Sequence, residues 1–306
     1  MMTRCGYEPV SGTYYETLGA GSAGRPPWLM LHGGSGTGAV FRLTADGRPG
    51  WADSLASRGD HQVWLVDYPG VGRSVSVDAL GVDYDAAVDG VVRLLRDVIG
   101  RPVILLGHSI GGSVAWKVAE LARPYVHGVL GIAAASPGNL QPEAEVVSDD
   151  GRNVTVMHES GLEITVGIDR MFVTPKEFVI GQWVTPTSRL DPEHVPAFLK
   201  AVGPTPPRMV LQRLGALGGI PPITDTGSFA GLWIRLVVAP NDPLHTREHT
   251  EPMAALFREW GADVEIVDLA GLGIDGNGHF MLSESNSDDV LAVIEREVAR
   301  RPQLVA

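Results

Sequence analysis

Short apolar runs alternate with longer segments of helical periodicity over most of the chain. Six runs are mostly apolar on both faces, as is typical of parallel strands covered by helices: residues 28–31, 63–67, 103–106, 129–134, 232–238 and 264–267. Between them, apolar positions recur at helical spacing over residues 85–99, 113–122, 248–260 and 288–300. Residues 14–17 predict an edge strand or a hairpin. This alternation predicts an α/β fold with a mostly parallel, doubly wound sheet.

The alternation stops between residues 141 and 229. Residues 153–166 alternate like a short hairpin with a turn at Ser160–Gly161. Proline-bounded helical segments follow at residues 175–184, 192–202 and 207–217. An insertion of this length between two strands predicts a lid over one end of the sheet, although a decorative insertion has the same pattern. We therefore expect an α/β core made of residues 1–140 and 230–306, and a cap made of residues 141–229.

The turn after the third run carries a motif with chemical meaning. It reads Gly107-His108-Ser109-Ile110-Gly111 and separates a predicted strand from a predicted helix. A sharp strand-to-helix turn of this composition exposes the serine hydroxyl at the carboxyl ends of the strands, where α/β sheets bind ligands. We predict that Ser109 is a nucleophile; a Gly-Ser turn that only caps a helix is the alternative.

A serine hydroxyl needs a base, and the base needs an acceptor that fixes its tautomer. Among nine histidines, His279 lies between the last predicted strand and the last predicted helix, so its loop reaches the same edge of the sheet. Asp242 follows the run at 232–238 and gives the chain order Ser, Asp, His. Asp268 and Asp275 are competing carboxylates, and Asp242 could instead cap a helix.

Acyl transfer also needs N–H donors for the developing oxyanion. The N–H of Ile110 follows the nucleophile, and the glycine-rich loop at residues 32–36 offers a second donor, for which we select Gly34. Glycines let this backbone approach a substrate closely. A phosphate-binding loop is the alternative, but the Lys-Ser or Lys-Thr of a P-loop and a dinucleotide fingerprint are both missing from the sequence.

Taken together and in this order, these motifs resemble the α/β-hydrolase superfamily over nearly the whole chain. The matching positions are residues 32–34, 67–74, 107–112, Asp242 and 278–280. Residues 37–41, 46–53 and 276–279 are similar to a subgroup of microbial carboxylesterases with an inserted cap. Some relatives carry the triad acid as a glutamate after strand six, whereas residues 135–139 hold no carboxylate here. The resemblance therefore also favours Asp242 as the acid.

Composition and charge exclude several other classes of protein. The 24 Lys and Arg against 36 Asp and Glu give a net charge of −12 without a basic run, which argues against nucleic-acid and anionic-membrane partners. The single cysteine, Cys5, allows neither an internal disulfide nor a cysteine metal cluster. Because the N-terminus lacks the apolar core of a signal peptide and no apolar run reaches the length of a membrane span, we predict a cytoplasmic protein. We expect neither a metal nor a cofactor.

The motifs favour a serine hydrolase that cleaves a small-molecule carboxylic ester or lactone through an acyl-enzyme. Five large residues of the cap are candidates for an apolar substrate pocket, although each could instead belong to the core of the cap: Phe172, Phe178, Trp183, Phe198 and Met209. Two alternatives use the same fold: a cofactor-independent lyase, cyclase or dioxygenase, and a receptor that binds a ligand with little turnover. The sequence leaves the oligomeric state open between monomer and homodimer.

Overall fold

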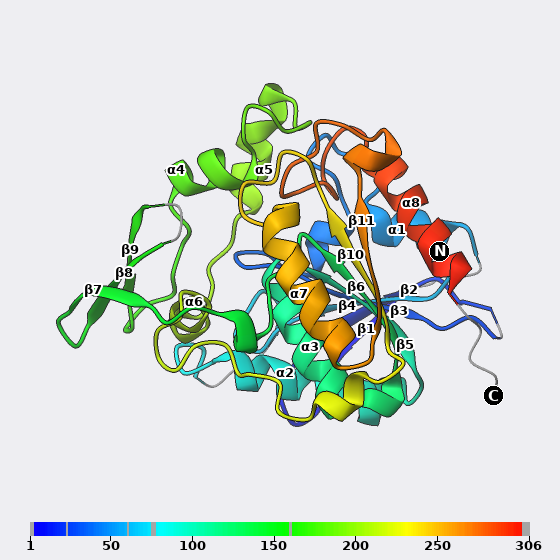
Figure 1. The fold of residues 1–306 in the computed structure, drawn as a ribbon, viewed down its shortest axis with the longest axis horizontal. Coiled ribbons are helices and arrows are strands. Elements are labelled where there is room, and N and C mark those ends of the chain that lie inside the picture. Colours follow the sequence, from blue (N-terminus) through cyan, green and yellow to red (C-terminus); the bar gives the residue numbers. More distant parts are fainter. Residues whose placement is uncertain (1–2, 23, 60, 75–77, 159–160, 302–306) are drawn as a thin grey trace.

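A central sheet of eight strands organises the chain (Figure 1). The computed structural model describes residues 3–22, 24–59, 61–74, 78–158 and 161–301. The strand order in the sheet is β1-β2-β4-β3-β5-β6-β10-β11. The strands are β1 (Thr3–Tyr7), β2 (Tyr14–Leu18), β3 (Trp28–Leu31), β4 (Val63–Asp67), β5 (Val103–His108), β6 (Val126–Ile132), β10 (Trp233–Val238) and β11 (Asp263–Asp268).

The predicted mostly parallel sheet is confirmed. Only the β1–β2 and β2–β4 pairs are antiparallel among these eight strands, and all pairs from β4 to β11 are parallel. Residues 14–17 form the inner strand of a hairpin, and β1 lies at the edge. The carboxyl ends of β3, β5, β10 and β11 therefore meet at one edge of the sheet, which is where functional side chains gather in such folds.

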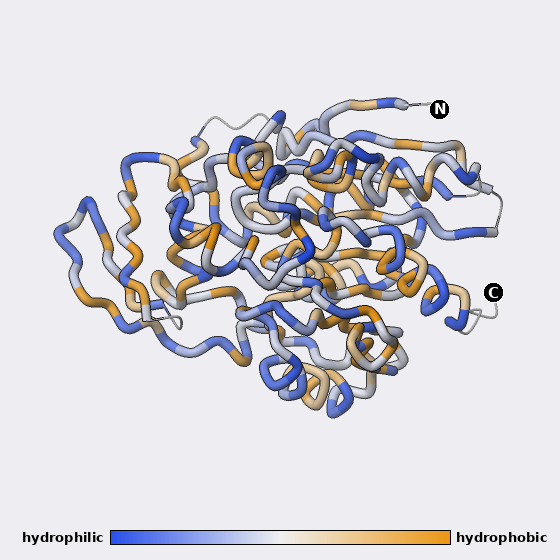
Figure 2. The backbone as a smooth tube through the Cα atoms, turned by 90° about the horizontal axis from the view of Figure 1, so that it is seen from above, coloured by the Kyte–Doolittle hydropathy of each residue, from blue (hydrophilic) through white to orange (hydrophobic). Residues whose placement is uncertain are grey.

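Helices cover both faces of the sheet, as successive strand residues require. Leu29 and Leu31 of β3 face one apolar cluster, and Trp28 and Met30 face the other, because side chains alternate along a strand. The first cluster includes residues of α2 (Tyr84–Arg93), α3 (Ile110–Leu121) and α7 (Arg247–Glu259). The second includes residues of α1 (Trp51–Ser57) and α8 (Ser287–Arg300). In Figure 2 the hydrophobic segments accordingly gather in the interior.

Among the helices of the core, the two that flank β5 differ from the sequence-based expectation by more than one residue or in helix type. The helix expected at residues 85–99 starts as α2 and continues as a π-helix, η2 (Leu94–Ile99), which ends at Gly100 with a left-handed φ of 65°. Helix α3 begins at Ile110, directly after Ser109, rather than at residue 113. The remaining short turns of the core are η1 (Gly38–Phe41), η3 (Arg123–Tyr125), η4 (Gly138–Leu140) and η8 (Ala270–Leu272), and η7 (Thr226–Phe229) ends the segment between β6 and β10.

Residues 141–229, between β6 and β10, begin with a second sheet that stands apart from the first (Figure 1). Its three antiparallel strands are β7 (Glu145–Asp149), β8 (Asn153–Met157) and β9 (Glu163–Gly167). The expected hairpin corresponds to β8 and β9, but its turn residue Ser160 lies outside the described residues. The helical segments that follow are α4 (Lys176–Phe178), η5 (Val179–Trp183), η6 (Pro192–His194), α5 (Val195–Ala201) and α6 (Pro207–Arg213).

The segment contributes to three apolar clusters. Val156, Val166 and Leu211 belong to a small cluster that, apart from Leu244, is made of residues of this segment. Ile223 and Phe229, near its end, belong to the large cluster under α3 and α7. Val179, Val184 and Phe198, in the middle of the segment, belong to the cluster on the other face of the sheet. Only the three-stranded part of the segment is thus packed mainly on itself, while its middle and its end are built into the main core. No helix in the described part of the chain is long and apolar enough to cross a membrane.

Candidate active site

Ser109 occupies a strained turn at the carboxyl end of β5. Its φ of 54° and ψ of −124° are values that L-residues avoid. Its N–H donates to the carbonyl of Ile132 (3.1 Å), and its carbonyl accepts from Ala135 N–H (2.9 Å), so the end of β6 holds the turn. A Cβ on Gly111 would lie 2.3 Å from the carbonyl oxygen of Leu31, which explains why glycine is required beside the serine.

Three side chains from three loops form a continuous hydrogen-bonded chain. Ser109 Oγ lies 3.1 Å from His279 Nε2, and His279 Nδ1 lies 3.0 Å from Asp242 Oδ2. The imidazole and the carboxylate are almost fully buried, with side-chain exposures of 1% and 0%. Because the Asp242 carboxylate can only accept, it selects the tautomer with hydrogen on Nδ1 and leaves the Nε2 lone pair facing the serine hydroxyl.

Asp242 is held as an anion. Burial alone would raise the pKa of this carboxyl, but the charge and the hydrogen bond of His279 outweigh burial and hold the pKa well below its usual range. The N–H groups of Leu244 (2.9 Å) and His245 (3.2 Å) donate to Oδ1 and stabilise the anion further. The competing Asp268 instead forms an ion pair with Arg247 at 3.0 Å. Asp242 is therefore the carboxylate that the fold places against His279.

The glycine loop after β3 lies directly against the nucleophile. A Cβ on Gly33 would lie 3.0 Å from Ser109 Cβ, closer than most side chains approach, so glycine favours this close packing. Gly34 and Ile110, the two residues expected to donate to an oxyanion, line the same cavity as Ser109. Neither of their N–H groups donates to another described residue, which leaves both available to a bound molecule.

Two further histidines contact His279 and hold it in place. His108 Nε2 lies 3.0 Å from the main-chain carbonyl of His279, and burial lowers the pKa of His108 to about 3, so a neutral ring donates there. The His245 ring stacks on His279, with 5.2 Å between ring centroids and an angle of 29°. Burial likewise lowers the pKa of His245 well below its ordinary value. Both rings are therefore neutral, and they hold His279 in place without adding a positive charge beside it.

An apolar cavity with a volume of about 100 Å³ opens over Ser109. Four of the five predicted pocket residues line it: Phe172, Phe178, Trp183 and Met209. Phe198 does not; it packs edge-on against Phe280 (4.7 Å between centroids) and lines a second cavity of about 310 Å³. Trp183 and Ser35 border both cavities, so the indole stands between them.

No local sequence pattern predicts the polar clasp that joins the glycine loop to residues 141–229. Ser35, with a positive φ of 57°, donates its N–H to Thr205 Oγ1 (2.9 Å). Its hydroxyl lies 2.7 Å from Thr174 Oγ1, and its carbonyl accepts from Gly203 N–H (2.7 Å). These bonds, which join residues 139 to 170 positions apart, fix the loop that carries Gly34.

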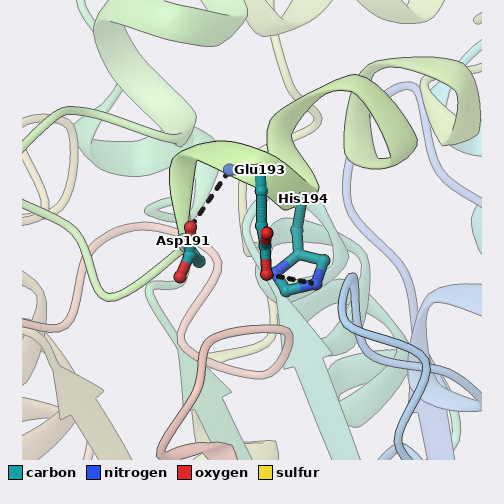
Figure 3. Close-up of side chains that lie close together, drawn as sticks. All are labelled: Asp191, Glu193 and His194. Atoms are coloured by element: carbon teal, nitrogen blue, oxygen red, sulfur yellow. Dashed lines mark hydrogen bonds and ion pairs between the residues drawn. The ribbon is translucent and has the colours of Figure 1, made fainter.

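One group of three potential metal ligands lies together in the described part of the chain, away from this site: Asp191, Glu193 and His194 (Figure 3). Asp191 accepts the Glu193 N–H (3.0 Å) as the cap of η6, and Glu193 lies 3.6 Å from the His194 ring. Both acidic side chains are exposed to solvent. Helix capping and a surface ion pair account for this cluster without a metal.

Comparison with known proteins agrees with the geometry. A family model described as the alpha/beta hydrolase family matches residues 28–293. A curated relative, a probable secreted lipase (phiG) from a fungal species, is 23% identical over an alignment that covers 88% of this chain and 80% of the relative.

Solved structures share the fold at low sequence identity. A methylesterase protein from Arabidopsis has a TM-score of 0.60 and 18% identity, covering 90% of this chain and 99% of that one. A thermophilic esterase from Thermogutta terrifontis has a TM-score of 0.60 and 18% identity, covering 94% and 93%. An N-acyl homoserine lactonase (AidH) has a TM-score of 0.57 and 16% identity, covering 98% and 99%.

Proposed function

The chain belongs to the alpha/beta hydrolase family, and from this premise we propose that it is a serine hydrolase that cleaves carboxylic esters or lactones. The observation that carries the proposal is the hydrogen-bonded chain from Ser109 through His279 to Asp242, at the mouth of an apolar cavity. A carboxylic ester is the substrate class that such a chain attacks most directly.

In the acylation step, Ser109 Oγ attacks the ester carbonyl while His279 Nε2 takes the hydroxyl proton. Asp242 stabilises the imidazolium that forms, because its low pKa keeps the carboxylate ionised. The tetrahedral oxyanion accepts hydrogen bonds from the N–H groups of Gly34 and Ile110. His279 then gives its proton to the leaving alcohol, and an acyl-enzyme on Ser109 remains.

In the deacylation step, a water molecule attacks the acyl-enzyme carbonyl and loses a proton to His279 Nε2. The same two N–H groups stabilise the second oxyanion, and Ser109 leaves with the proton that His279 returns. In a lactone the alcohol stays attached to the acyl group, so one open-chain hydroxy acid is released. All steps use side chains and amides of this chain and water.

The cavity favours a small, apolar acyl or alcohol group. Phe172, Phe178 and Met209 give it an apolar wall, and at about 100 Å³ it is smaller than the cavity of about 310 Å³ on the other side of Trp183. The names of the fungal lipase, the esterases and the lactonase describe carbonyl substrates of this general kind for those proteins. The cytoplasmic location stays a prediction, since the name of the fungal relative describes that protein as secreted.

A series of p-nitrophenyl esters, from acetate to decanoate, tests the proposal with wild type and Ser109→Ala side by side. We expect wild type to prefer short chains, and Ser109→Ala to lose about 10⁴-fold in kcat. Ser113→Ala is the matched control, because it removes a buried hydroxyl further along α3 and should keep kcat within about twofold of wild type.

Two outcomes would reject the proposal. Equal turnover by wild type and Ser109→Ala would exclude Ser109 as the nucleophile. Failure of wild type to hydrolyse any ester or lactone, together with failure of a fluorophosphonate to label Ser109, would direct attention to a lyase or a ligand-binding protein on the same fold.

A further inference from the structure

The buried carboxylate of Glu284 lies next to the histidine loop and takes no part in the proton transfers described above. Glu284 precedes α8 and is 1% exposed. Its Oε1 accepts the N–H of Gly278 at 2.8 Å, and its Oε2 accepts the Nδ2–H of Asn277 at 2.6 Å. The two donors are the residues that immediately precede His279. A single side chain therefore holds the backbone on which the imidazole is carried.

The same network reaches the loop that carries Asp242. The main-chain carbonyl of Asn277 accepts the N–H of Asn241 at 2.9 Å, one residue before the carboxylate that holds His279. The side chains of Asn277 and Asn286 exchange two further hydrogen bonds, of 2.7 and 3.0 Å. Asn277 itself is completely buried. The loops of the acid and of the base are thus linked through one asparagine, whose amide is oriented by Glu284.

We propose that Glu284 is a positioning residue: its carboxylate fixes the Asn277–Gly278 turn and thereby the distances among Asp242, His279 and Ser109. The inference rests on the proposed serine hydrolase function. A buried carboxylate is costly to ionise, and a well-packed amide or apolar residue would stabilise this loop at lower cost. The geometry of the site must be held within a fraction of an ångström. This requirement explains why the Glu284 carboxylate is placed against both residues before His279.

No described residue forms an ion pair with the Glu284 carboxylate. Arg48 donates to the main-chain carbonyl of Glu284 (2.9 Å), and its guanidinium pairs with Asp288 at the start of α8. The Arg189 guanidinium is bound to the main chain of Asp275. Asp242 is the nearby like charge. Burial, with the Asp242 charge, raises the pKa of Glu284 to about 7.

Protonation would change what Glu284 can hold. The ionised carboxylate accepts from Asn277 and Gly278 at the same time, whereas the protonated form carries a hydrogen on one of the two oxygens and competes with a donor. Positioning of His279 should therefore be complete above neutral pH and weaken below it. This loss on the acid side of the rate profile belongs to Glu284 and is separate from the requirement that His279 Nε2 accept the Ser109 proton.

The test compares wild type with Glu284→Gln, which keeps the shape but faces one donor with an NH₂ group. For p-nitrophenyl butyrate we expect kcat to fall between about 10-fold and 100-fold, with KM changed less than about threefold. The contribution of Glu284 near neutral pH should disappear from the kcat profile. Glu120→Gln is the matched control: Glu120 is also buried and holds a loop, at Thr224, far from His279, and this variant should keep the wild-type rate and profile.

A second readout does not depend on turnover. The proton between His279 Nδ1 and Asp242 gives a far-downfield proton NMR resonance, which should be sharp in wild type and in Glu120→Gln and broadened in Glu284→Gln. If wild type cleaves no ester, the proposed function fails while this resonance still tests the positioning role. An unchanged kcat, pH profile and resonance in Glu284→Gln would overturn the inference, as would a change in KM alone.

If Glu284→Gln does not fold, the Asn286→Ala variant tests the positioning role instead. Asn286 makes no side-chain cap for α8, so its loss spares the helix while it releases the Asn277 amide. We expect kcat to fall about threefold to tenfold, because a small displacement of His279 weakens catalysis. We also expect the resonance to broaden. Wild-type kcat and a sharp resonance in Asn286→Ala would overturn the inference.

Discussion

At the scale of single residues, the site combines strain with burial. Ser109 holds a backbone conformation that glycine adopts without penalty, and the bonds to Ile132 and Ala135 keep it there. Asp242 and Glu284 are both buried carboxyls near His279, yet their environments move their pKa values in opposite directions. Asp242 has the histidine as its partner, while Glu284 has only neutral donors.

The strain at Ser109 predicts an unusual order of stability. Ser109→Gly should be more stable than Ser109→Ala by about 1 kcal/mol, because glycine relieves the positive φ. Urea unfolding of both inactive variants measures the difference. At Ser113, inside α3, the order should reverse, and glycine should cost about 1 kcal/mol relative to alanine. Equal stability of the two Ser109 variants would contradict the strain.

Glu284 predicts a pH dependence of stability with a definite sign. Because its pKa rises from 4.5 to about 7 on folding, the native chain keeps a proton that the unfolded chain has released between these pH values. Its stabilising contribution is complete below about pH 4.5 and is lost as the pH rises through 7. Relative to Glu284→Gln, the free energy of unfolding of wild type should fall from pH 5 to pH 8 in urea titrations; a rising difference would refute the raised pKa.

At the scale of elements, strand ends and short helices place the site. The glycine loop follows β3, the nucleophile follows β5, the acid follows β10 and the base follows β11. The sequence identified these loops because each follows an apolar run. Strands β3, β5 and β10 are buried on both faces, whereas the edge strand β11 exposes Asp263 and Glu265. It did not reveal α1 or β7, since α1 is only seven residues long and every residue of β7 is exposed. Strand β7 has no buried face, and the buried face of α1 (Trp51, Ala52, Leu55 and Ala56) is too short to show a helical period in the sequence.

Trp183, the last residue of η5, predicts the range of substrate length. Its indole borders the cavity of about 100 Å³ over Ser109 and the cavity of about 310 Å³ beyond it. Trp183→Ala should join them and move the best p-nitrophenyl ester to a longer acyl chain. Phe198→Ala enlarges only the second cavity and should leave the optimum unchanged. An unchanged optimum in Trp183→Ala would show that the second cavity is not used.

At the scale of the whole molecule, the two sheets are stabilised unequally. Residues of β5 are buried throughout under helices on both faces, whereas β8 lies in a three-stranded sheet with a small apolar cluster. We expect amides of β8 to exchange with deuterium at a lower opening free energy than those of β5 in a native-state urea series. Coincident exchange of both strands would mean that residues 141–229 and the core unfold as one unit.

The sequence by itself determined the layered α/β fold and the identities of the site residues that lie on loops after apolar runs. Ser109 follows from its glycine motif, and Asp242 and His279 follow from their positions after the last two predicted strands, because parallel strands bring their carboxyl ends to one edge. Asp242 was one of three acids that the pattern allowed. Its hydrogen bond to His279 distinguishes it from the other two in the structure.

Only the tertiary structure decided the contacts between segments that are far apart in the chain. The clasp of Ser35 with Thr205, the position of Phe198 in a second cavity and the stacking of His245 on His279 have no local pattern. Glu284 lies five residues after His279, but its role appears only when the turn folds its carboxylate back onto Gly278. Periodicity reports which face of an element is buried, and it carries no information about which partner occupies that face.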